Sequence, residues 1–254
     1  MGTRVLIIVL FVLSILTSSA LTYLLINKTN SGKAGSGDIG AEVAKFIENN
    51  PEVIIQALRK SQNAKADQEA QDTEKNAIEL RPQLENNATD GQAGNKDGDV
   101  TVVAFHDHNC GYCRKSIPDI EKLITEDKGI KFVLKDFPIL GPVSIEKAKA
   151  SIAVAKLAPE KWFSFYDAMG KSNAQTSEQL AELVQTTVGI DPIKLKSEME
   201  SKDTANKISE NHALGEQLFI NGTPVFIVNG KVIRGAAGYD AFKAAVAEAR
   251  AKKS

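Results

Sequence analysis

Apolar residues are concentrated at the amino end of the chain. Val5 to Ile26 is a run of 22 residues without a charge. A helix of that length extends about 33 Å, enough to cross a bilayer core of about 30 Å. We expect residues 1–26 to be a retained membrane anchor whose amino end stays inside, because Arg4 precedes the apolar run. A signal peptide cleaved near Ser18 to Ala20 is the alternative. Both interpretations place the rest of the chain outside the cytoplasm.

The pattern then changes to a polar tether and a helical region. Residues 27–37 are rich in Gly, Ser and Lys, which is typical of a flexible tether. Residues 38–85 have helical periodicity, with apolar positions only in the first part of the region. We expect these positions to be an oligomerisation surface that packs between chains: Ile39, Val43, Phe46, Ile47, Ile54, Ile55 and Leu58. Docking of the same face on the chain's own catalytic domain is the alternative.

A second change of pattern introduces the main domain. Residues 86–98 (NNATDGQAGNKDG) are rich in turn-forming residues, which predicts a linker and a domain boundary. In residues 99–254, β-branched residues predict one strand at Val100–Asp107 and another at Ile130–Phe137. The segment between these strands, from Cys110 to about Thr125, has a helical pattern. This strand–helix–strand order predicts a parallel pair of strands.

Helices without an intervening strand occupy the middle of this domain, at about 139–219. The expected helices are Ser144–Ala158, Glu160–Met169, Ser177–Val188, and Pro192–Phe219 with a break near Asp203. Two β runs then flank Asn229-Gly230, a pair suited to the positive φ angles of a type I′ hairpin, and a last helix follows. The order indicates an α/β protein with a thioredoxin-type sheet, a helical insertion and an amino-terminal helical extension.

The charge balance and the two cysteines limit the functions that this chain can have. The chain has 31 basic and 32 acidic residues, so its charge gives no reason to expect nucleic acid as a partner. Its two cysteines, Cys110 and Cys113, both lie in the segment HDHNCGYCRK. A disulfide between them would close a loop too short to restrain the unfolded chain appreciably, which argues against a structural role.

A metal site is one alternative for this segment. Cys110 and Cys113, with His106 or His108, are ligands that zinc or copper prefer. A closed four-ligand site within eight residues would, however, prevent the expected turn from strand to helix. We therefore expect no metal here.

Redox chemistry accounts for the segment better. A cysteine at the start of a helix lies near unpaired backbone N–H groups and the positive end of the helix dipole, which favour the thiolate. Cys110 would attack a client disulfide. Cys113, one turn further along the helix and less exposed, would then resolve the mixed disulfide. The expected location outside the cytoplasm is also where disulfides persist.

A family resemblance supports this interpretation. The segments FHDHNCGYC and GTPVFIVNG, with helices between them, resemble the disulfide-bond protein A (DsbA) group of the thioredoxin superfamily over about Asp99 to Lys252. The extension containing NNPEVIIQAL is similar to relatives of the suppressor-of-copper-sensitivity C type, which are oligomeric. The resemblance implies a protein disulfide oxidoreductase without a cofactor. It also implies that Thr223-Pro224 is a cis-proline loop that binds substrate beside Cys110.

The chain departs from strongly oxidising members of that group. Those proteins commonly have a histidine between the cysteines and a buried carboxylate on the preceding strand. This chain has Gly111 and Tyr112 between its cysteines and Ala104 at the expected place of the acid. The Gly-Tyr pair resembles that of the isomerase disulfide-bond protein C. We therefore expect a lower reduction potential than in strong oxidants, and isomerase activity.

The resemblance also implies partners. We expect exported cysteine-containing clients in the periplasm. A membrane partner would either keep Cys110 and Cys113 reduced, like disulfide-bond protein D (DsbD), or oxidised, like disulfide-bond protein B (DsbB). Isomerisation requires a surface that holds a partly folded client, so we expect a homodimer, with a trimer as the alternative. Two other functions stay open: a periplasmic copper or zinc carrier, and a tethered scaffold.

Other residues have ordinary structural explanations. We expect four aromatic side chains in the core of the insertion: Trp162, Phe163, Phe165 and Tyr166. His212 is expected at or near the surface. Lys135 and Asp136 are adjacent in a strand and so point to opposite faces of the sheet. At most one of them faces the cysteines.

Overall fold

The computed structural model describes residues 36–252 of a chain that divides into two units, 1–65 and 66–254. The expected anchor and residues 27–35 of the expected tether lie outside the described residues. Ser36 and Gly37, also expected in the tether, begin a helix instead. Within residues 36–252, no helix is long and apolar enough to cross a membrane.

Two helices form the described part of the first unit. They are α2 (Ser36–Asn49) and the first half of α3 (Pro51–Glu79). The proposed oligomerisation residues lie on these helices, and between 36% and 62% of the surface of each side chain is exposed in the single chain. The helical periodicity of this region is thereby confirmed, and its role in assembly stays a prediction.

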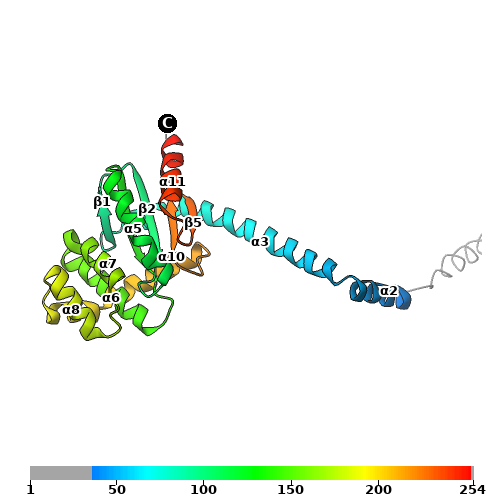
Figure 1. Ribbon diagram of the computed structural model, residues 1–254, viewed down its shortest axis with the longest axis horizontal. Coiled ribbons are helices and arrows are strands. Elements are labelled where there is room, and N and C mark those ends of the chain that lie inside the picture. The colour runs from blue at the N-terminus through cyan, green and yellow to red at the C-terminus, as the bar shows by residue number, and fades with distance from the viewer. Residues whose placement is uncertain (1–35, 253–254) are drawn as a thin grey trace, which may run out of the picture. The chain divides into compact units, whose positions relative to one another are not determined.

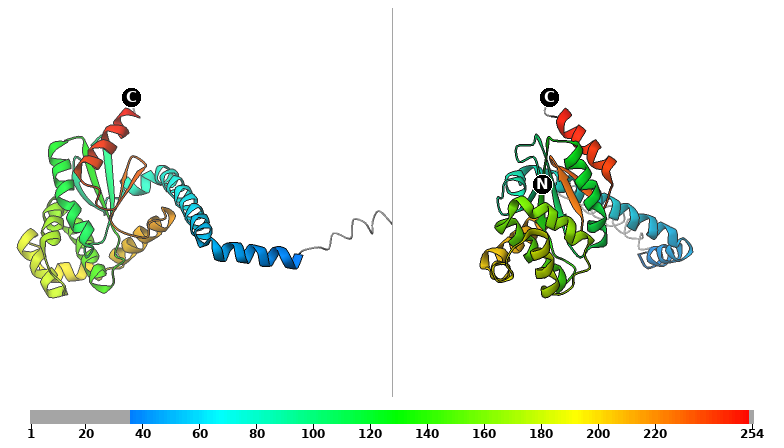
Figure 2. Two further views of the ribbon diagram at one scale, coloured as in Figure 1. Left: turned by 45° about the vertical axis from the view of Figure 1, so that its right-hand side comes forward. Right: turned by 60° about the vertical axis from the view of Figure 1, so that its left-hand side comes forward.

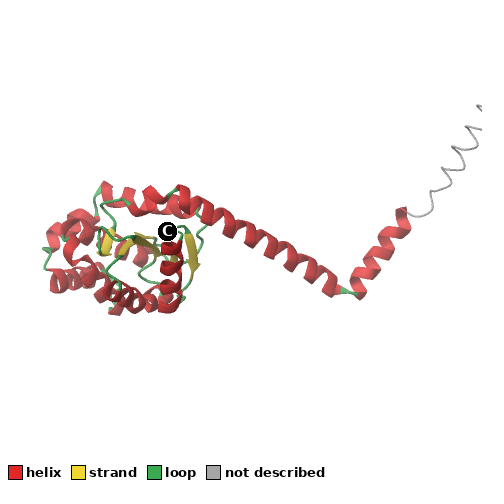
Figure 3. Ribbon diagram, turned by 90° about the horizontal axis from the view of Figure 1, so that it is seen from above, coloured by secondary structure: helices red, strands yellow, loops and turns green. Residues whose placement is uncertain are grey.

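A five-stranded sheet of order β1-β3-β2-β4-β5 organises the second unit (Figures 1 and 3). The central strands β2 (Val100–His106) and β3 (Ile130–Asp136) are parallel. The hairpin β4 (Val225–Val228) and β5 (Lys231–Arg234) joins β2 in antiparallel orientation. The turn between them has positive φ at Asn229 and Gly230, as expected for this dipeptide. The predicted thioredoxin-type α/β fold is confirmed.

Strand β1 (Gly91–Gly94) corrects one expectation. It lies inside residues 86–98, which the sequence suggested were a linker, and pairs antiparallel with β3 from Gly91↔Leu134 to Gly94↔Lys131. Its sequence GQAG has no β-branched residue, so local propensity gives no sign of a strand. The strand is specified by its partner β3 and by close packing, because a Cβ at Gly91 would lie 2.0 Å from the Trp162 ring.

Helices cover both faces of the sheet. On one face, α5 (Gly111–Glu126) and α11 (Tyr239–Ala251) pack with alternate residues of β2, among them Val102 and Ala104 (Figure 2). On the other face, Val103 and Phe105 pack with the end of α3, with α4 (Arg81–Glu85) and with α10 (Lys202–Gln217). The alternation of β2 between two cores explains why all its residues are buried.

The helical insertion closely matches the expected boundaries. It contains α6 (Pro142–Leu157), η1 (Pro159–Lys161), α7 (Trp162–Lys171), α8 (Ser177–Val188), α9 (Pro192–Met199) and α10. Trp162, Phe165 and Tyr166 are buried in its core as expected, whereas Phe163 is half-buried.

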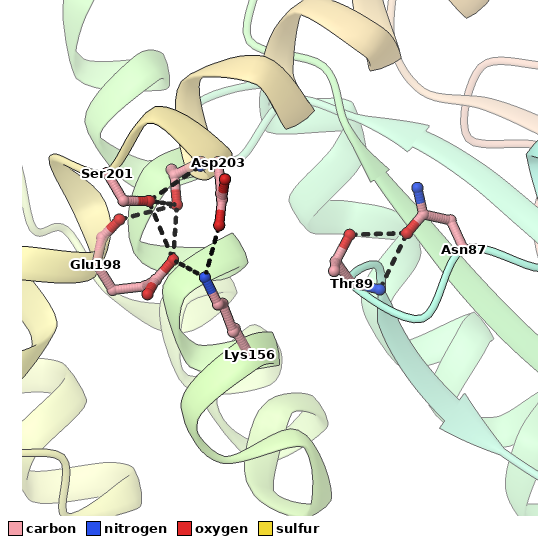
Figure 4. Close-up of polar contacts among 7 residues, drawn as sticks. Asn87, Thr89, Lys156, Glu198, Ser201 and Asp203 are labelled. Atoms are coloured by element: carbon pink, nitrogen blue, oxygen red, sulfur yellow. Dashed lines mark hydrogen bonds and ion pairs between the residues drawn. The ribbon is translucent and has the colours of Figure 1, made fainter.

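Local polar contacts fix the ends of these helices. The expected break lies at Ser201, whose hydroxyl accepts a hydrogen bond from the N–H of Thr204 at 3.1 Å and caps α10. Lys156 of α6 pairs with Glu198 at 2.9 Å and with Asp203 at 3.2 Å, which ties the helices on either side of the break to α6 (Figure 4). Figure 4 also shows Asn87, whose side-chain oxygen accepts hydrogen bonds from Thr89 in the turn that leads to β1.

Candidate active site

The two cysteines lie at the carboxyl end of β2, where the chain turns into α5. Cys110 is the N-cap residue of α5, and its N–H donates to the carbonyl of Asp107 at 3.0 Å. Cys110 is 9% exposed and Cys113 is fully buried, which is the expected difference between the two thiols. Between them, Tyr112 is 68% exposed and a side chain at Gly111 would meet no neighbour.

The Thr223-Pro224 loop lies beside Cys110, although 113 positions separate Cys110 from Thr223. Its peptide bond is cis, as the resemblance implied. The Cys110 thiol donates to the carbonyl oxygen of Thr223, with a distance of 3.4 Å between sulfur and oxygen. The structure thus brings the predicted redox pair and the predicted substrate loop together, and an extended client segment could reach both.

The environment of Cys113 keeps its thiol protonated. Burial strongly raises the pKa of Cys113, and hydrogen bonds from the Thr223 side chain and the Asp107 backbone only partly oppose this rise. The adjacent Cys110 raises the pKa of Cys113 further. Since a thiolate is the nucleophile in disulfide exchange, Cys113 must lose a proton before it attacks a mixed disulfide.

Buried Asp107 fixes the loops around the pair. One of its carboxylate oxygens accepts the N–H of Asn109 at 2.7 Å. The other accepts the N–H groups of Ile139 at 2.8 Å and Leu140 at 2.9 Å. The half-exposed Ile139 and Leu140 are thereby held in the loop that follows β3. The sequence did not predict that Asp107 would bind these backbone N–H groups. Its position at the end of a strand was the one feature in the sequence that indicated a special role.

A buried polar layer lies at the ends of β2 and β3, and sequence reasoning missed it as well. The ring nitrogen Nδ1 of His106 is 2.9 Å from the hydroxyl of Tyr166, a residue of α7. The Nε2 atom of His108 is 2.6 Å from a carboxylate oxygen of Asp136. Burial raises the pKa of Asp136, and the hydrogen bond to His108 opposes the rise. Two histidines beside the cysteine motif were a visible signal, but the sequence could not identify their partners.

Asp136 and Lys135 point to opposite faces of β3, as expected for neighbours in a strand. Lys135 is 2.5 Å from Asp90 and donates to the carbonyl of Gln83 at 2.9 Å. Lys207 of α10 also pairs with Asp90. Burial lowers the pKa of Lys135, although Asp90 opposes this shift. Asp136 is therefore the member of the pair that faces α5 and the cysteines.

The histidines near the cysteines have partners other than a metal. Nδ1 of His106 and Nε2 of His108 are taken by Tyr166 and Asp136. Across residues 36–252, no group of three or more His, Cys, Asp or Glu side chains is arranged to hold a metal ion. His212, which was expected near the surface, is half-buried against the ring of Phe137 with 4.7 Å between ring centroids.

Comparisons with known proteins agree with this geometry. A family model described as "Thioredoxin" matches residues 86–248. Over 160 residues, the chain is 29% identical to disulfide bond formation protein D of Bacillus subtilis, covering 59% of this chain and 72% of that protein.

Solved structures with the same fold include two of note. The thiol-disulfide exchange protein alpha-DsbA2 of Wolbachia pipientis has 29% sequence identity to this chain, and the two structures superpose with a TM-score of 0.65. The match covers 70% of this chain and 97% of that protein. ScsC of Proteus mirabilis, in a transitional conformation, has 25% sequence identity to this chain and superposes with a TM-score of 0.64. The match covers 85% of this chain and 96% of that protein.

Proposed function

This chain belongs to the thioredoxin family as a DsbA-like thiol–disulfide oxidoreductase, and we propose that it reshuffles disulfides in exported proteins through Cys110 and Cys113. The observation that carries the proposal is the placement of Cys110. Its sulfur lies at the N-terminus of α5, and 3.4 Å from the carbonyl of the cis Thr223-Pro224 loop. These features supply a nucleophile and a backbone edge for an extended client.

The reaction proceeds in two thiol–disulfide exchanges. In the first, the Cys110 thiolate attacks a client disulfide, forms a mixed disulfide and releases one client thiol. In isomerisation, another client thiolate then attacks the mixed disulfide, which forms a new client disulfide and restores Cys110. In net reduction of the client, Cys113 attacks Cys110 instead, so the Cys110–Cys113 disulfide forms and the second client thiol leaves.

The residues around the pair support isomerase character. Ala104 is fully buried in the core beneath α5, so no carboxylate occupies that place on β2. Tyr112 is largely exposed between the cysteines, where it can contact a client. A less strongly oxidising pair spends more time reduced, and a reduced Cys110 is the form that starts isomerisation.

The proposed function also concerns the proteins with which this chain exchanges disulfides and the compartment in which it acts. The described relatives include proteins named for disulfide bond formation and thiol-disulfide exchange, which supports exported cysteine-containing clients. We infer a location in the periplasm, with a membrane partner of the DsbD or DsbB type. Thiol trapping in intact cells tests the partner, because a DsbD-type partner predicts mostly reduced Cys110 and Cys113, whereas a DsbB-type partner predicts mostly oxidised cysteines.

Substitution of each cysteine tests the enzymatic proposal. We expect Cys110→Ala to abolish both insulin reduction and refolding of scrambled ribonuclease, because it removes the attacking sulfur. Cys113→Ala should retain attack and accumulate mixed disulfides, which are visible on non-reducing gels, because it lacks the resolving thiol. Retention of either activity by Cys110→Ala would refute the assignment.

A further inference from the structure

A short apolar segment is exposed next to the cysteines. Within residues 66–252, three of the exposed large apolar side chains fall between Ile139 and Ile145. Ile139 is 38% exposed, Leu140 is 51% exposed and Ile145 is 40% exposed. Single apolar side chains are ordinary on a surface, but a group of them beside a redox pair indicates contact with another chain. The two thiol–disulfide exchanges need no such segment, so its presence requires a separate explanation.

The backbone of this segment is fixed by hydrogen bonds. The N–H of Phe137 donates to the carbonyl of His106 at 2.8 Å, which extends the contact between β3 and β2 by one residue. The N–H groups of Ile139 and Leu140 then donate to one carboxylate oxygen of Asp107, at 2.8 and 2.9 Å. Because a buried partner satisfies both N–H groups, the backbone is held in place while the two side chains stay at the surface.

The same residue also holds the turn that contains Cys110. The second carboxylate oxygen of Asp107 accepts the N–H of Asn109 at 2.7 Å. The carbonyl of Asp107 accepts the N–H of Cys110 at 3.0 Å. Lys147 of α6, the helix that follows the apolar segment, donates to the side chain of Asn109 at 3.2 Å. Asp107 is 1% exposed, so water competes little for these bonds. One buried carboxylate therefore joins the cysteine turn to the apolar segment.

The partner that fits this surface is the client segment whose disulfide Cys110 attacks. Cysteine and the apolar residues are the types most often buried in folded proteins. A partly folded client therefore exposes its cysteines together with apolar neighbours, whereas a folded protein hides both. A client that is bonded to the Cys110 sulfur lies beside Asp107, where its apolar neighbours can contact Ile139 and Leu140. The apolar segment is in this way continuous with the redox pair.

On the basis of the proposed function, we propose that Asp107 is a positioning residue for disulfide exchange, which sets where a client side chain bound on Ile139 and Leu140 lies relative to the sulfur of Cys110. Its carboxylate acts through the two loops and takes no part in the bonds that form and break. A carboxylate suits this role because both of its oxygens accept N–H groups, whereas an amide accepts on one oxygen only. Asp107→Asn would therefore hold the apolar segment or the cysteine turn, but not both.

Stopped-flow kinetics on the reduced full-length chain test this role with three disulfide probes. Two are fluorescently labelled peptide disulfides that have either Leu and Val or Ser and Gly beside their cysteines. The third is dithiobis(nitrobenzoate). For each peptide, the dependence of rate on concentration gives a half-saturating concentration and a maximal rate. In the wild-type chain we expect the apolar peptide to half-saturate at a concentration about tenfold lower than the polar peptide.

Substitutions then separate the apolar segment from its anchor. Leu140→Ser should reduce the preference for the apolar peptide about fivefold, because it removes part of the contact. Asp107→Asn should reduce the same preference and also lower the maximal rate about tenfold, because the bound client is no longer aligned with Cys110. Adding Leu140→Ser to Asp107→Asn should then have no further effect on the preference. Ile193→Ser is the matched control and should behave as the wild type, because Ile193 is 80% exposed on α9, outside the segment.

Each outcome decides between explanations. An unchanged preference in Leu140→Ser, a surface substitution, or in a folded Asp107→Asn would overturn the proposal. Additive losses in the double variant, or failure of Asp107→Asn to fold, would show that the carboxylate is structural and would overturn the positioning role. A smaller mass of Leu140→Ser in light scattering would assign the segment to contacts between copies of the chain instead. Failure of the wild-type chain to reduce any of the three probes would refute the proposed function itself, which the other outcomes leave standing.

Discussion

At the residue scale, Cys110 and Cys113 are three positions apart but have different surroundings. Cys110 is at the start of α5 and touches the Thr223 carbonyl, whereas Cys113 is enclosed and its pKa is raised by burial. The first thiol can meet a client, and the second is protected from any disulfide except one that involves Cys110. This division prevents the two cysteines from exchanging roles.

The residues between and below the cysteines lead to a prediction about redox potential. Gly111-Tyr112 and the buried Ala104 supply no charged or imidazole group that would stabilise the reduced pair as in a strong oxidant. We expect a potential below the value of about −120 mV found for DsbA and nearer the value of about −180 mV of protein disulfide isomerase. A glutathione redox titration measures it.

The matched variant for this prediction is Tyr112→His, because Tyr112 is 68% exposed and its replacement leaves the core intact. A histidine there should raise the potential by stabilising the Cys110 thiolate. A wild-type value at or above about −120 mV would contradict the expectation of isomerase character.

At the scale of elements, β1 shows how tertiary packing overrides local preference. Its four residues are not strand formers, yet β3 offers a free edge and the Trp162 ring leaves room for a backbone without a side chain at Gly91. Helix α7 therefore packs against β1 because position 91 is a glycine. The insertion and the sheet are joined at this contact.

Substitution of Gly91 tests the contact. We expect Gly91→Ala to lower the free energy of unfolding by about 1–3 kcal/mol, because the new Cβ overlaps the Trp162 ring and overpacks the core. Urea denaturation followed by circular dichroism measures the change. Gly111→Ala is the control, since a Cβ there meets no neighbour and its helical position tolerates alanine. Equal stabilities of the two variants would show that β1 does not depend on this close approach.

At the scale of the whole molecule, we consider whether several copies of the chain assemble through the apolar residues of α2 and early α3. The apolar side chains of α2 and early α3 are exposed in the single chain, with Phe46 at 56% and Ile54 at 41%. Scattered apolar residues are ordinary on a protein surface, but seven within about 20 consecutive positions indicate an interaction surface. A second copy of the chain is the partner that we propose, as a dimer with a trimer as the alternative.

Phe46→Asp combined with Ile54→Asp tests assembly. We expect light scattering to give the mass of a single chain for this variant and a multiple of it for the wild type. Insulin reduction should persist, because the cysteines are untouched, whereas refolding of scrambled ribonuclease should fall. Lys60→Gln in the same helix is the control and should assemble like the wild type. A wild-type mass that equals one chain would end the proposal.

A deletion can also test whether the amino-terminal helices hold copies of the chain together, provided that it ends before the second unit, which begins at Ala66. Thr73 and Ala77 of α3 are buried, and Asn76 donates to the carbonyl of Gln217 at 2.7 Å. Removal of residues 38–76 would therefore damage the catalytic unit as well. Removal of residues 38–62 leaves these contacts in place and separates assembly from folding.

The sequence by itself determined the features that depend on neighbours along the chain. The helix that begins after Cys110, the break at Ser201 and the Asn229-Gly230 turn each follow from backbone preferences or caps within a few residues. The redox pair was recognisable for the same reason, since its spacing and its place between strand and helix are local.

Only the tertiary structure decided what distant segments bring to one another. Strand β1 depends on β3, and the partners of His106 and His108 come from α7 and β3. The side of the sheet taken by Lys135 was fixed by Asp90 and Lys207. Side-chain pairing across long stretches of chain has no counterpart in local propensity, because its energy depends on distances that exist only after the strands and helices have packed.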